Sequence, residues 1–484
     1  MTTIVTINGN LTGSEGSNKL TVGNHAEFSA GNIYLSELGG NFTVTVGSNA
    51  RFESGVIEGV NKLTIGNGIA FAYEAGGAKD QVYTQFASGM ISGTTGNDAI
   101  TIGNYTDTSI AAFSLGKGND TVKIGNFNSR ENGYEADVNV LGGIDLGAGK
   151  NALSIGAQSR LNTAMIEGVN TLSLAAGAAT ADGNYYTEIY CSGITGSELA
   201  DTITIGKLAN LIVDGDIDLT SGEEAGMKNA INLGSLGTLQ AGDVTGVNKL
   251  TVGAGTVDEW TVLDINDLTG TDQDDVFAAG NYSLFSVDSI DGAGSVKGDK
   301  LTIGQGVTAI FRGTISDIDV ITIGNNTEIY ASTEATNILK NTAPENDTVT
   351  WYNIGSADVA KGFTDAKSEN ADDEGIDTRE GAVFQNGTNG WLSNGDIQDF
   401  VDYIQLSDDG TWEITDAGGN LNVTLHEITA SGLTEITTAA NVSYEDGTWT
   451  ISDYDAETMV VCVEIAKVDE VTKRGTFGYT TTLA

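Results

Sequence analysis

The segment Asp98-Ala99-Ile100-Thr101-Ile102-Gly103 contains an acidic residue, two aliphatic residues two positions apart, and a closing glycine. With Asn also allowed at the first position, full copies of this pattern begin at Asn18, Asn61, Asp98, Asp120, Asn151, Asp201, Asn229, Asn248, Asp275, Asp299 and Asp319. Near copies begin at Phe42 and Asn170, and Asp80–Gln85 is a degenerate copy. The step from one copy to the next is as short as 19 residues after Asn151 and reaches 31 residues after Asp120. A fixed minimum number of residues per copy, with a variable number of extra residues, is typical of coils that carry loop insertions.

Each copy predicts a short β-strand. Its two apolar side chains, for example Leu63 and Ile65, lie two positions apart, which is the period of a strand. The closing glycine permits either a positive φ or a close approach of two backbones at the corner. One copy buries only two side chains, so copies must stack on one another to form a core. We therefore predict an all-β chain with a parallel β-helix, a β-solenoid of about 13–14 coils, followed by a smaller β-rich domain.

Stacking makes two further predictions about equivalent positions of the copies. The Asn or Asp that opens each strand is expected to bond to the backbone of a neighbouring coil, forming an amide ladder. The alternative is a turn residue, chosen because Asn and Asp tolerate corners. The second aliphatic positions are expected to form one stacked column that contains Ile102, Ile124, Ile155, Ile205 and Ile303.

Other recurring segments indicate how a coil closes. A second phrase precedes the opening amide at Ile57–Asn61, Ile166–Asn170 and Val244–Asn248, and short apolar segments follow the main strand at Ala26–Phe28 and Ala50–Phe52. Together with the main strand they predict a cross-section with three sides. The longest coils are expected to place their excess residues in surface loops, at Asn126–Val138, Ala178–Glu188 and Asp214–Met227.

The repeat pattern stops near Ala331, and the composition changes after Pro344, the only proline. We place a domain boundary near residue 340, with the repeat domain at residues 1–340 and a β-rich C-terminal domain at residues 341–484. Strands of the second domain are expected at Thr411–Thr415, Asn420–Leu425, Thr448–Ser452 and Met459–Ala466.

Charge and cysteine content narrow the function classes. The chain has 484 residues and a formal net charge of -44, and an acidic surface of this kind repels nucleic acid and anionic lipid. No apolar run approaches the roughly 18 residues that span a bilayer, so we expect neither nucleic-acid binding nor membrane insertion. Cys191 and Cys462 form no metal-binding spacing and are expected to be free thiols. The N-terminal residues lack the features of a conventional signal peptide.

Two segments, Gly93-Thr94-Thr95-Gly96-Asn97-Asp98 and Gly116-Lys117-Gly118-Asn119-Asp120, place a glycine-rich turn before the acidic residue. They resemble the glycine-rich nonapeptide of the hemolysin-type calcium-binding (RTX) family, in which turn carbonyls and an aspartate hold calcium between coils. The resemblance implies calcium as a cofactor, with Asp98, Asp120, Asn97 and Asn119 as ligands and Asp274 and Asp275 as a second acidic corner. The chain departs from that family because it lacks uninterrupted tandem nonapeptides. A plain hydrogen-bonded turn is the alternative.

A second segment, Ile397–Leu406, is similar to a phrase that often follows such repeats in proteins exported by type I secretion. The usual spacer within that phrase is shortened in this chain. The resemblance covers ten residues, and an amphipathic strand pair is the alternative reading. It implies an extracellular or bacterial cell-surface location.

Three functions are compatible with this pattern. The first is a structural surface protein that assembles into filaments or a lattice, or acts as an adhesin, and associates with itself end to end or with a surface glycan or another cell-surface component. The second is a calcium-dependent RTX-like secreted module. The third is a polysaccharide lyase or hydrolase on a β-helix. The enzyme reading is disfavoured because His25 and His426 are the only histidines and no other candidate lies near either in the sequence. We expect a non-enzymatic surface protein.

Overall fold

The computed structural model describes residues 3–13, 16–35, 41–68, 83–128, 137–180, 183–220, 228–257, 259–294, 298–342, 348–353, 403–406, 412–415, 421–429, 432–445, 448–452, 461–467 and 473–476. Contacts divide the chain into two units, Met1–Gly280 with Ala293–Val296, and Asn281–Gly292 with Lys297–Ala484. Each unit is described by itself below.

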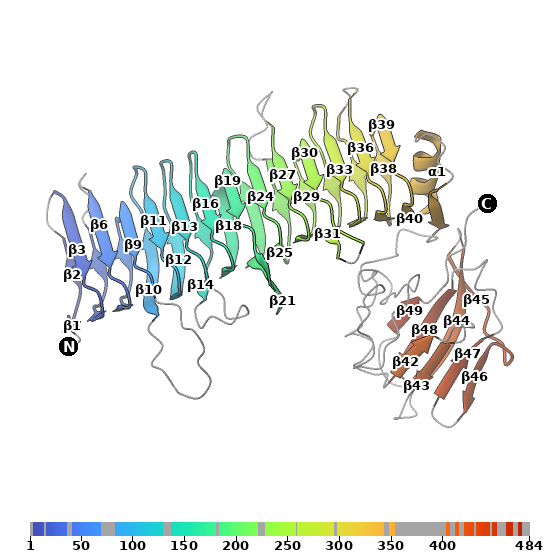
Figure 1. The fold of residues 1–484 in the computed structure, drawn as a ribbon, viewed down its shortest axis with the longest axis horizontal. Helices are drawn as coiled ribbons and strands as arrows, with labels where there is room; N and C mark the ends of the chain where they lie inside the picture. The colour runs from blue at the N-terminus through green and yellow to red at the C-terminus, as the bar shows by residue number, and fades with distance from the viewer. Residues whose placement is uncertain are drawn as a thin grey trace. The chain divides into compact units, whose positions relative to one another are not determined.

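Unit 1 contains a row of parallel strands, the main row, which coincides with the copies of the recurring phrase (Figure 1). Neighbouring strands pair in register, so Ile100 lies beside Val122 and Ile102 beside Ile124. The main row consists of β3 (Asn18–Val22), β6 (Phe42–Val46), β9 (Lys62–Ile65), β11 (Ala99–Ile102), β13 (Thr121–Ile124), β16 (Ala152–Ile155), β19 (Thr171–Leu174), β24 (Thr202–Ile205), β27 (Ala230–Leu233), β30 (Lys249–Val252) and β33 (Val276–Ala279).

Two more rows of parallel strands complete the three predicted sides. The second row of unit 1 consists of β1 (Thr3–Thr6), β4 (Ala26–Ser29), β7 (Arg51–Glu53), the first part of β10 (Thr84–Ser92) and of β12 (Thr106–Ser114), β14 (Val138–Val140), β17 (Arg160–Thr163), β22 (Thr187–Cys191), β25 (Ala209–Val213), β28 (Thr238–Gln240) and β31 (Thr261–Ile265). The third row consists of β2 (Leu11–Thr12), β5 (Ile33–Tyr34), β8 (Ile57–Glu58), the last part of β10 and of β12, β15 (Ile144–Asp145), β18 (Met165–Val169), β23 (Gly193–Gly196), β26 (Ile217–Asp218), β29 (Val244–Thr245) and β32 (Leu268–Thr269). An antiparallel pair, β20 (Ala178–Thr180) and β21 (Gly183–Tyr185), lies in an insertion before β22.

Unit 2 repeats the three-row pattern. Its strands are β36 (Lys300–Ile303) and β39 (Val320–Ile323) of the main-row type, β34 (Ser283–Val287), β37 (Thr308–Phe311), β40 (Glu328–Ala331) and β41 (Thr350–Asn353) of the second-row type, and β35 (Ile290–Asp291) and β38 (Ile315–Ser316) of the third-row type. The helix α1 (Thr333–Thr342) packs against β38, β39 and β40, with Ala335 and Leu339 fully buried. Ser332 caps this helix, because its Oγ accepts a hydrogen bond from the N–H of Ala335.

The C-terminal residues form two antiparallel sheets of four strands, as the β-rich prediction requires. One sheet has the order β42 (Tyr403–Leu406), β43 (Trp412–Thr415), β47 (Thr448–Ile451), β46 (Val442–Glu445). The other has the order β45 (Gly432–Glu435), β44 (Leu421–Thr429), β48 (Val461–Lys467), β49 (Lys473–Thr476). Of the secretion-like phrase Ile397–Leu406, only Tyr403–Leu406 lies within the described residues. The boundary near residue 340 stays a prediction.

The chain is therefore an all-β protein with a parallel β-solenoid of about 12 turns. The degenerate copy Asp80–Gln85 was expected to form an additional main strand, and this prediction is wrong. The strand β9 pairs directly with β11, and Thr84 and Gln85 belong to β10 in the second row. The segment matches the phrase only at Asp80 and Val82, and one turn fewer than expected separates Asn61 from Asp98.

The aliphatic column is confirmed within unit 1. Ile102 pairs with Ile124, Ile124 with Ile155, Ile155 with Leu174, and Leu174 with Ile205. Each of these side chains is at most 2% exposed. Burial of a side chain of this size stabilises the fold by about 1.5–3 kcal/mol, so the stack of coils rather than any single strand holds the solenoid together. Ile303 is buried in the same manner in unit 2.

The closing glycines are required for close approach and not for a positive φ. A Cβ atom at Gly47 would lie 2.5 Å from the backbone nitrogen of Asn24 in the preceding coil, and one at Gly125 would lie 2.6 Å from the carbonyl carbon of Gly103. The positive φ of the corner instead falls two residues later, on residues with side chains, such as Tyr105 (φ 52°). The corner therefore brings neighbouring backbones closer than a Cβ allows.

Candidate functional site

The amide ladder is confirmed at several pairs of neighbouring coils, where a side-chain oxygen of one coil accepts from the backbone of the coil before it. The backbone N–H of Asp98 donates to Oδ1 of Asp120 at 2.7 Å, and the N–H of Asp120 donates to Oδ1 of Asn151 at 2.8 Å. The N–H of Asp201 donates in the same way to Oδ1 of Asn229 at 2.8 Å. At these coils the opening side chain satisfies a buried backbone donor of the preceding coil, which would otherwise cost about 1–3 kcal/mol.

Where the ladder residue is an aspartate, a hydroxyl four residues earlier usually holds its carboxylate. Thr94 donates to Asp98 through its backbone N–H (2.7 Å) and its Oγ1 (2.9 Å). Ser197 makes the same two contacts with Asp201, and Thr271 makes them with Asp275. All three aspartates are at most 1% exposed. Burial raises the pKa of Asp98 and of Asp201, and these hydrogen bonds oppose that increase.

The coil before each of these three aspartates opens with an asparagine, and its side chain contacts the aspartate. Nδ2 of Asn61 lies 3.3 Å from Oδ1 of Asp98, and Asn170 and Asn248 approach the next aspartate in the same way. Each of these asparagines ends the phrase Gly-Val-Asn. The aspartates end the phrase [ST]-G-[ST]-x-x-x-D, in Ser92–Asp98, Thr195–Asp201 and Thr269–Asp275. The phrase Gly-Val-Asn was recognised in the sequence, whereas [ST]-G-[ST]-x-x-x-D was not. The second phrase contains the hydroxyl residue and would have predicted these contacts.

Asp120 lacks this arrangement. Gly116 occupies the position four residues before it, and Oδ2 of Asp120 is buried without a hydrogen-bond partner. In the next coil, Nδ2 of Asn151 donates to the carbonyl oxygens of Leu146, Gly147 and Gly168. Burial, together with the negative charge of Asp98, raises the pKa of Asp120 to about 6. Burial and the neighbouring charge therefore favour the protonated form of this carboxyl group.

The oxygens predicted to bind calcium are mostly in use within the fold. Asp98 accepts from Thr94, and Oδ1 of Asp120 accepts from the backbone of Asp98. Oδ1 of Asn97 accepts from the N–H of Asn119 at 2.8 Å, and Oδ1 of Asn119 accepts from the N–H of Lys150 at 2.9 Å. Among the predicted side-chain ligands at this corner, Oδ2 of Asp120 has no hydrogen-bond partner, whereas calcium takes six to eight oxygens. As they lie, these side chains do not fit calcium unless hydrogen bonds are exchanged.

The second acidic corner separates its two aspartates. Asp275 is fully buried and contacts Thr271, whereas Asp274 is exposed. Adjacent residues at the start of a strand point to opposite sides, so the two carboxylates do not converge on one ion. Within the part of the chain that the structure describes, no group of three or more His, Cys, Asp or Glu residues is placed to hold a metal.

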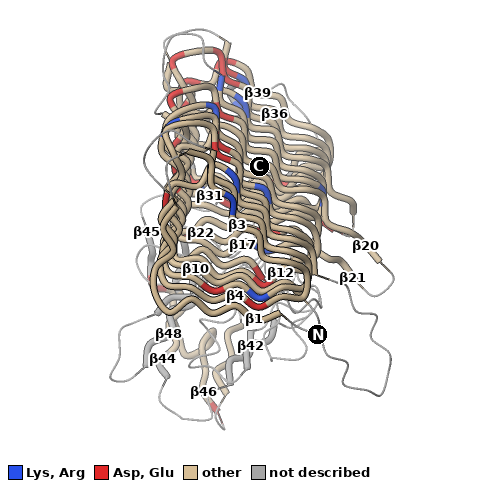
Figure 2. Tube along the Cα trace, turned by 90° about the vertical axis from the view of Figure 1, so that its left-hand side faces the viewer, with Lys and Arg blue, Asp and Glu red and all other residues tan. Residues whose placement is uncertain are grey.

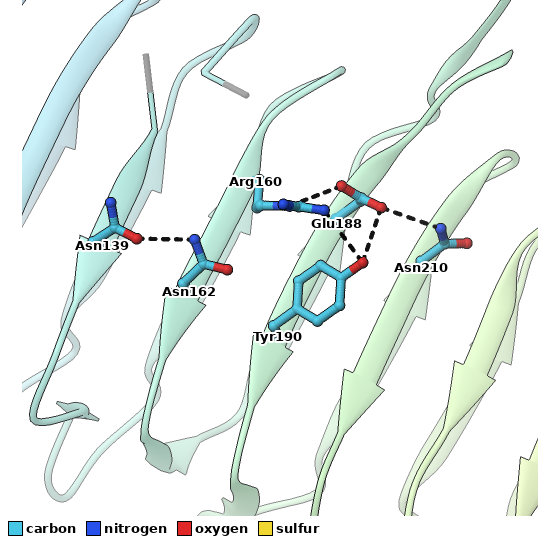
Figure 3. A network of polar contacts seen from close by, with 6 residues as sticks. All are labelled: Asn139, Arg160, Asn162, Glu188, Tyr190 and Asn210. Atoms are coloured by element: carbon cyan, nitrogen blue, oxygen red, sulfur yellow. Dashed lines mark hydrogen bonds and ion pairs between the residues drawn. The ribbon is translucent and has the colours of Figure 1, made fainter. Parts of the chain in front are cut away.

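A polar network lies on the outward side of the second row, and it was not predicted from the sequence (Figure 3). Nε of Arg160 on β17 donates to Oε2 of Glu188 on β22 at 3.0 Å, and the guanidinium lies 4.7 Å from the ring centroid of Tyr190. Tyr190 and Asn210 donate to Oε1 of Glu188 at 3.3 and 3.4 Å. The Glu188 side chain is 9% exposed. Glu188 had been expected at the end of a surface loop, but it lies within β22.

Burial, followed by the charge of Glu188, raises the pKa of Tyr190, so its hydroxyl keeps its proton as a donor to that carboxylate. The network is a largely buried ion pair whose carboxylate also accepts from Tyr190 and Asn210, whereas Oδ1 of Asn210 is buried without a partner.

Cys191 follows the network and points into the core. It is a free thiol, as predicted, and burial raises its pKa to about 12. Such a thiol is inert, because the thiolate is the reactive form. Cys462 lies within β48, and its side chain lies outside the described residues. No helix among the described residues is long and apolar enough to cross a membrane.

The fold and its corner ladders place the chain in the class of parallel β-solenoid repeat proteins. A comparison with protein-family models finds no match, and comparisons with curated proteins and with solved structures find none either.

Proposed function

We propose that this chain is a structural protein of an extracellular or bacterial cell surface and that it assembles end to end with copies of itself. Repetition supports this proposal, because every coil of unit 1 presents the same backbone pattern to the next. A surface whose hydrogen bonds all point along one axis is a template for another chain.

The observation that carries the proposal is Gly23, which closes β3. The equivalent glycines Gly47, Gly66 and Gly125 each lie against the backbone of a preceding coil. A Cβ at Gly23 would meet nothing within 4 Å, and the φ of this residue is not positive. Gly23 is thus a glycine at a position where, in later coils, a glycine is needed to fit the preceding coil. No described residue packs against Gly23 itself. In the second row, β1 pairs with β4 and exposes 66% of Ile4.

A second copy supplies strands for this side. The two C-terminal sheets end in the edge strands β42, β46, β45 and β49, each of which has one neighbour among the described residues. Strand addition of such an edge to the first coil of another copy is a heterologous contact, and a contact of this type grows into filaments or lattices when it does not close. The net charge of -44 opposes this association, so divalent cations should promote it by screening and bridging.

The test is a matched pair of glycine substitutions observed by electron microscopy and light scattering. Gly23→Val should leave the melting temperature of the protein unchanged and abolish filaments, because the new side chain blocks an incoming coil. Gly47→Val should lower the melting temperature, because its Cβ would lie 2.5 Å from the backbone nitrogen of Asn24. Filaments of Gly23→Val that resemble those of the wild type would refute the proposal, as would a wild type that stays monomeric at high concentration with millimolar calcium.

Calcium as a stabiliser is a separate part of this proposal. Oδ2 of Asp120 is the predicted ligand oxygen without a partner, so stabilisation through this corner depends on Asp120. If calcium binds here by exchanging hydrogen bonds at this corner, it should raise the melting temperature of the wild type and of Asp274→Asn, and this gain should be absent in Asp120→Asn. Equal gains in all three proteins would place the effect elsewhere. Adhesion to a surface glycan stays a prediction, as does the polysaccharide-active alternative, and no contact among the described residues favours either one.

A further inference from the structure

The outward side of the main row, called here the main-row face, has an unusual composition. Side chains alternate along each strand, so every main strand buries its aliphatic pair and turns the residues between them outward. In unit 1 one outward position per strand forms a line of mostly hydroxyl side chains, Thr21, Thr45, Thr64, Thr101, Lys123, Ser154, Ser173, Thr204, Asn232, Thr251 and Ala278.

The main-row face is also the cationic side of an acidic chain. Its strands in unit 1 contain the exposed lysines Lys19, Lys62, Lys123 and Lys249, and none of these strands contains Asp or Glu. The whole chain has 66 acidic and 22 basic residues, so a side without acid is a marked departure from the average. Within the described residues none of these lysines takes part in an ion pair. In Figure 2, basic positions (blue) occur beside the labels β3 and β36, and Lys300 of β36 continues this composition within unit 2.

The third row has the opposite charge. Each of its short strands turns about one side chain outward, and in unit 1 these include Glu58, Asp145, Glu167 and Asp218. The strands of this row contain no Lys or Arg. Outward side chains of the third row are called here the third-row face. Unit 1 thus has one side whose strands contain lysines and no acid, and another side whose strands contain acids and no base.

We propose that the main-row face of one copy binds the third-row face of a second copy, side by side, so that end-to-end filaments join into sheets. This inference rests on the proposed end-to-end assembly and adds a lateral contact to it. Charge complementarity selects the pair of faces, because lysines without a carboxylate partner meet carboxylates on a side without bases. The contact is heterologous and leaves a free face on each copy, so it extends indefinitely.

The occupant is a second copy, because the third-row face of this same chain supplies carboxylates on a side without bases. The strands of both faces recur at about 4.8 Å, and the charged side chains occupy some of the coils on each face. The arginines of the second row in unit 1 are already paired and do not compete for the third-row face. Arg51 lies 2.5 Å from Glu53, and Arg160 is held by Glu188.

The test compares two double variants with the same change in net charge. Lys62→Glu/Lys123→Glu reverses two charges on the main-row face, whereas Lys117→Glu/Lys150→Glu reverses two exposed charges at the corner outside this face. Both are made on Gly23→Val, so that lateral association is measured without filament growth, by sedimentation equilibrium at about physiological ionic strength. The face variant should weaken the association constant at least tenfold, and the corner variant should change it less than twofold. Association should decline at high salt, because exposed charges are screened within about 3 Å at 1 M salt.

A charge-swapped partner separates this proposal from a loss of folding. Mixing the face variant with Glu58→Lys/Glu167→Lys should restore association between the two chains, although neither associates with itself. Equal weakening in the face and corner variants, or no restoration on mixing, would overturn the lateral contact even if filaments form. Gly23→Val that is monomeric throughout would overturn it as well. Binding of polygalacturonate through Lys62 and Lys123 by a monomeric protein would assign the face to an anionic glycan instead.

Discussion

The backbone N–H of Asp98 donates a 2.7 Å hydrogen bond to Oδ1 of Asp120, which lies 22 residues further along the chain and one coil further along the solenoid. Both side chains are at most 1% exposed. The bond fixes the position of the Asp120 carboxyl group but leaves its second oxygen buried without a partner. A ladder that satisfies backbone donors along the stack thus has, at this coil, an acid in the position of an amide.

The first prediction concerns the pH dependence of stability. The pKa of Asp120 is about 6 in the folded protein, against an ordinary value of 3.8, so between these values the folded state binds more protons than the unfolded state. The free energy of unfolding should therefore fall as pH rises from about 4 to about 7, by on the order of 1–3 kcal/mol from this group. The raised pKa values of Asp98 and Asp201 act in the same direction. Melting temperatures recorded across this range provide the measurement.

Asp120→Asn isolates that contribution, because the amide has a similar shape but carries no charge to bury. The variant should be more stable than the wild type at pH 7.5, and the difference should disappear near pH 4. Asp274→Asn removes the same charge from an exposed side chain and should leave the pH profile unchanged. A gain that is equal at both pH values would contradict the assignment to Asp120.

The second prediction concerns the hydroxyl contact at Asp98. Thr94→Ala removes the Oγ1 that donates to Asp98 and accepts from Nδ2 of Asn61. The loss should cost about 1–3 kcal/mol, because buried polar groups are left unsatisfied. Thr95→Ala, at the exposed neighbour, should be neutral within about 0.5 kcal/mol. Similar melting temperatures for the two variants would show that the contact contributes little.

The third prediction concerns the aliphatic column. Ile124→Ala should destabilise the protein by about 2–5 kcal/mol, because it leaves a cavity between Ile102 and Ile155. Lys123→Ala changes the adjacent outward residue and should stay within about 0.5 kcal/mol of the wild type. Calorimetry of both variants is the measurement, and an unaffected Ile124→Ala would mean that the inward register is wrong.

The fourth prediction separates two ion pairs by their burial. Arg160→Ala leaves the nearly buried Glu188 without its cation, which should cost about 3–5 kcal/mol. Arg51→Ala breaks a pair whose side chains are 57% and 46% exposed, so its effect should be about 0–1 kcal/mol. Thermal unfolding that ranks Arg51→Ala as the more damaging variant would contradict this description of the network.

The solenoid was predictable because its signal is local. A strand such as β11 needs only two aliphatic residues at period two and a closing glycine, and the stack follows from the recurrence of that phrase. The segment Asp80–Gln85 shows the limit of that signal, because a match at two positions of a short phrase occurs by chance. The Arg160–Glu188 pair was not predictable in the same way, because the two residues are 28 positions apart and their register depends on an insertion between them. The close approach at Gly47 was not predictable either, because the neighbouring backbone belongs to another coil.

The two types of coil at Asn61 and Asp98, at Asn170 and Asp201, and at Asn248 and Asp275 have a consequence for engineering the length of the protein. In each couple the amide belongs to the earlier coil and the hydroxyl-clamped acid to the later one, so the junction between them has a direction. A designer who duplicates a single coil of such a couple repeats either the amide or the acid, so one copy lacks its partner. Duplicating the whole couple keeps each amide beside a hydroxyl-clamped acid.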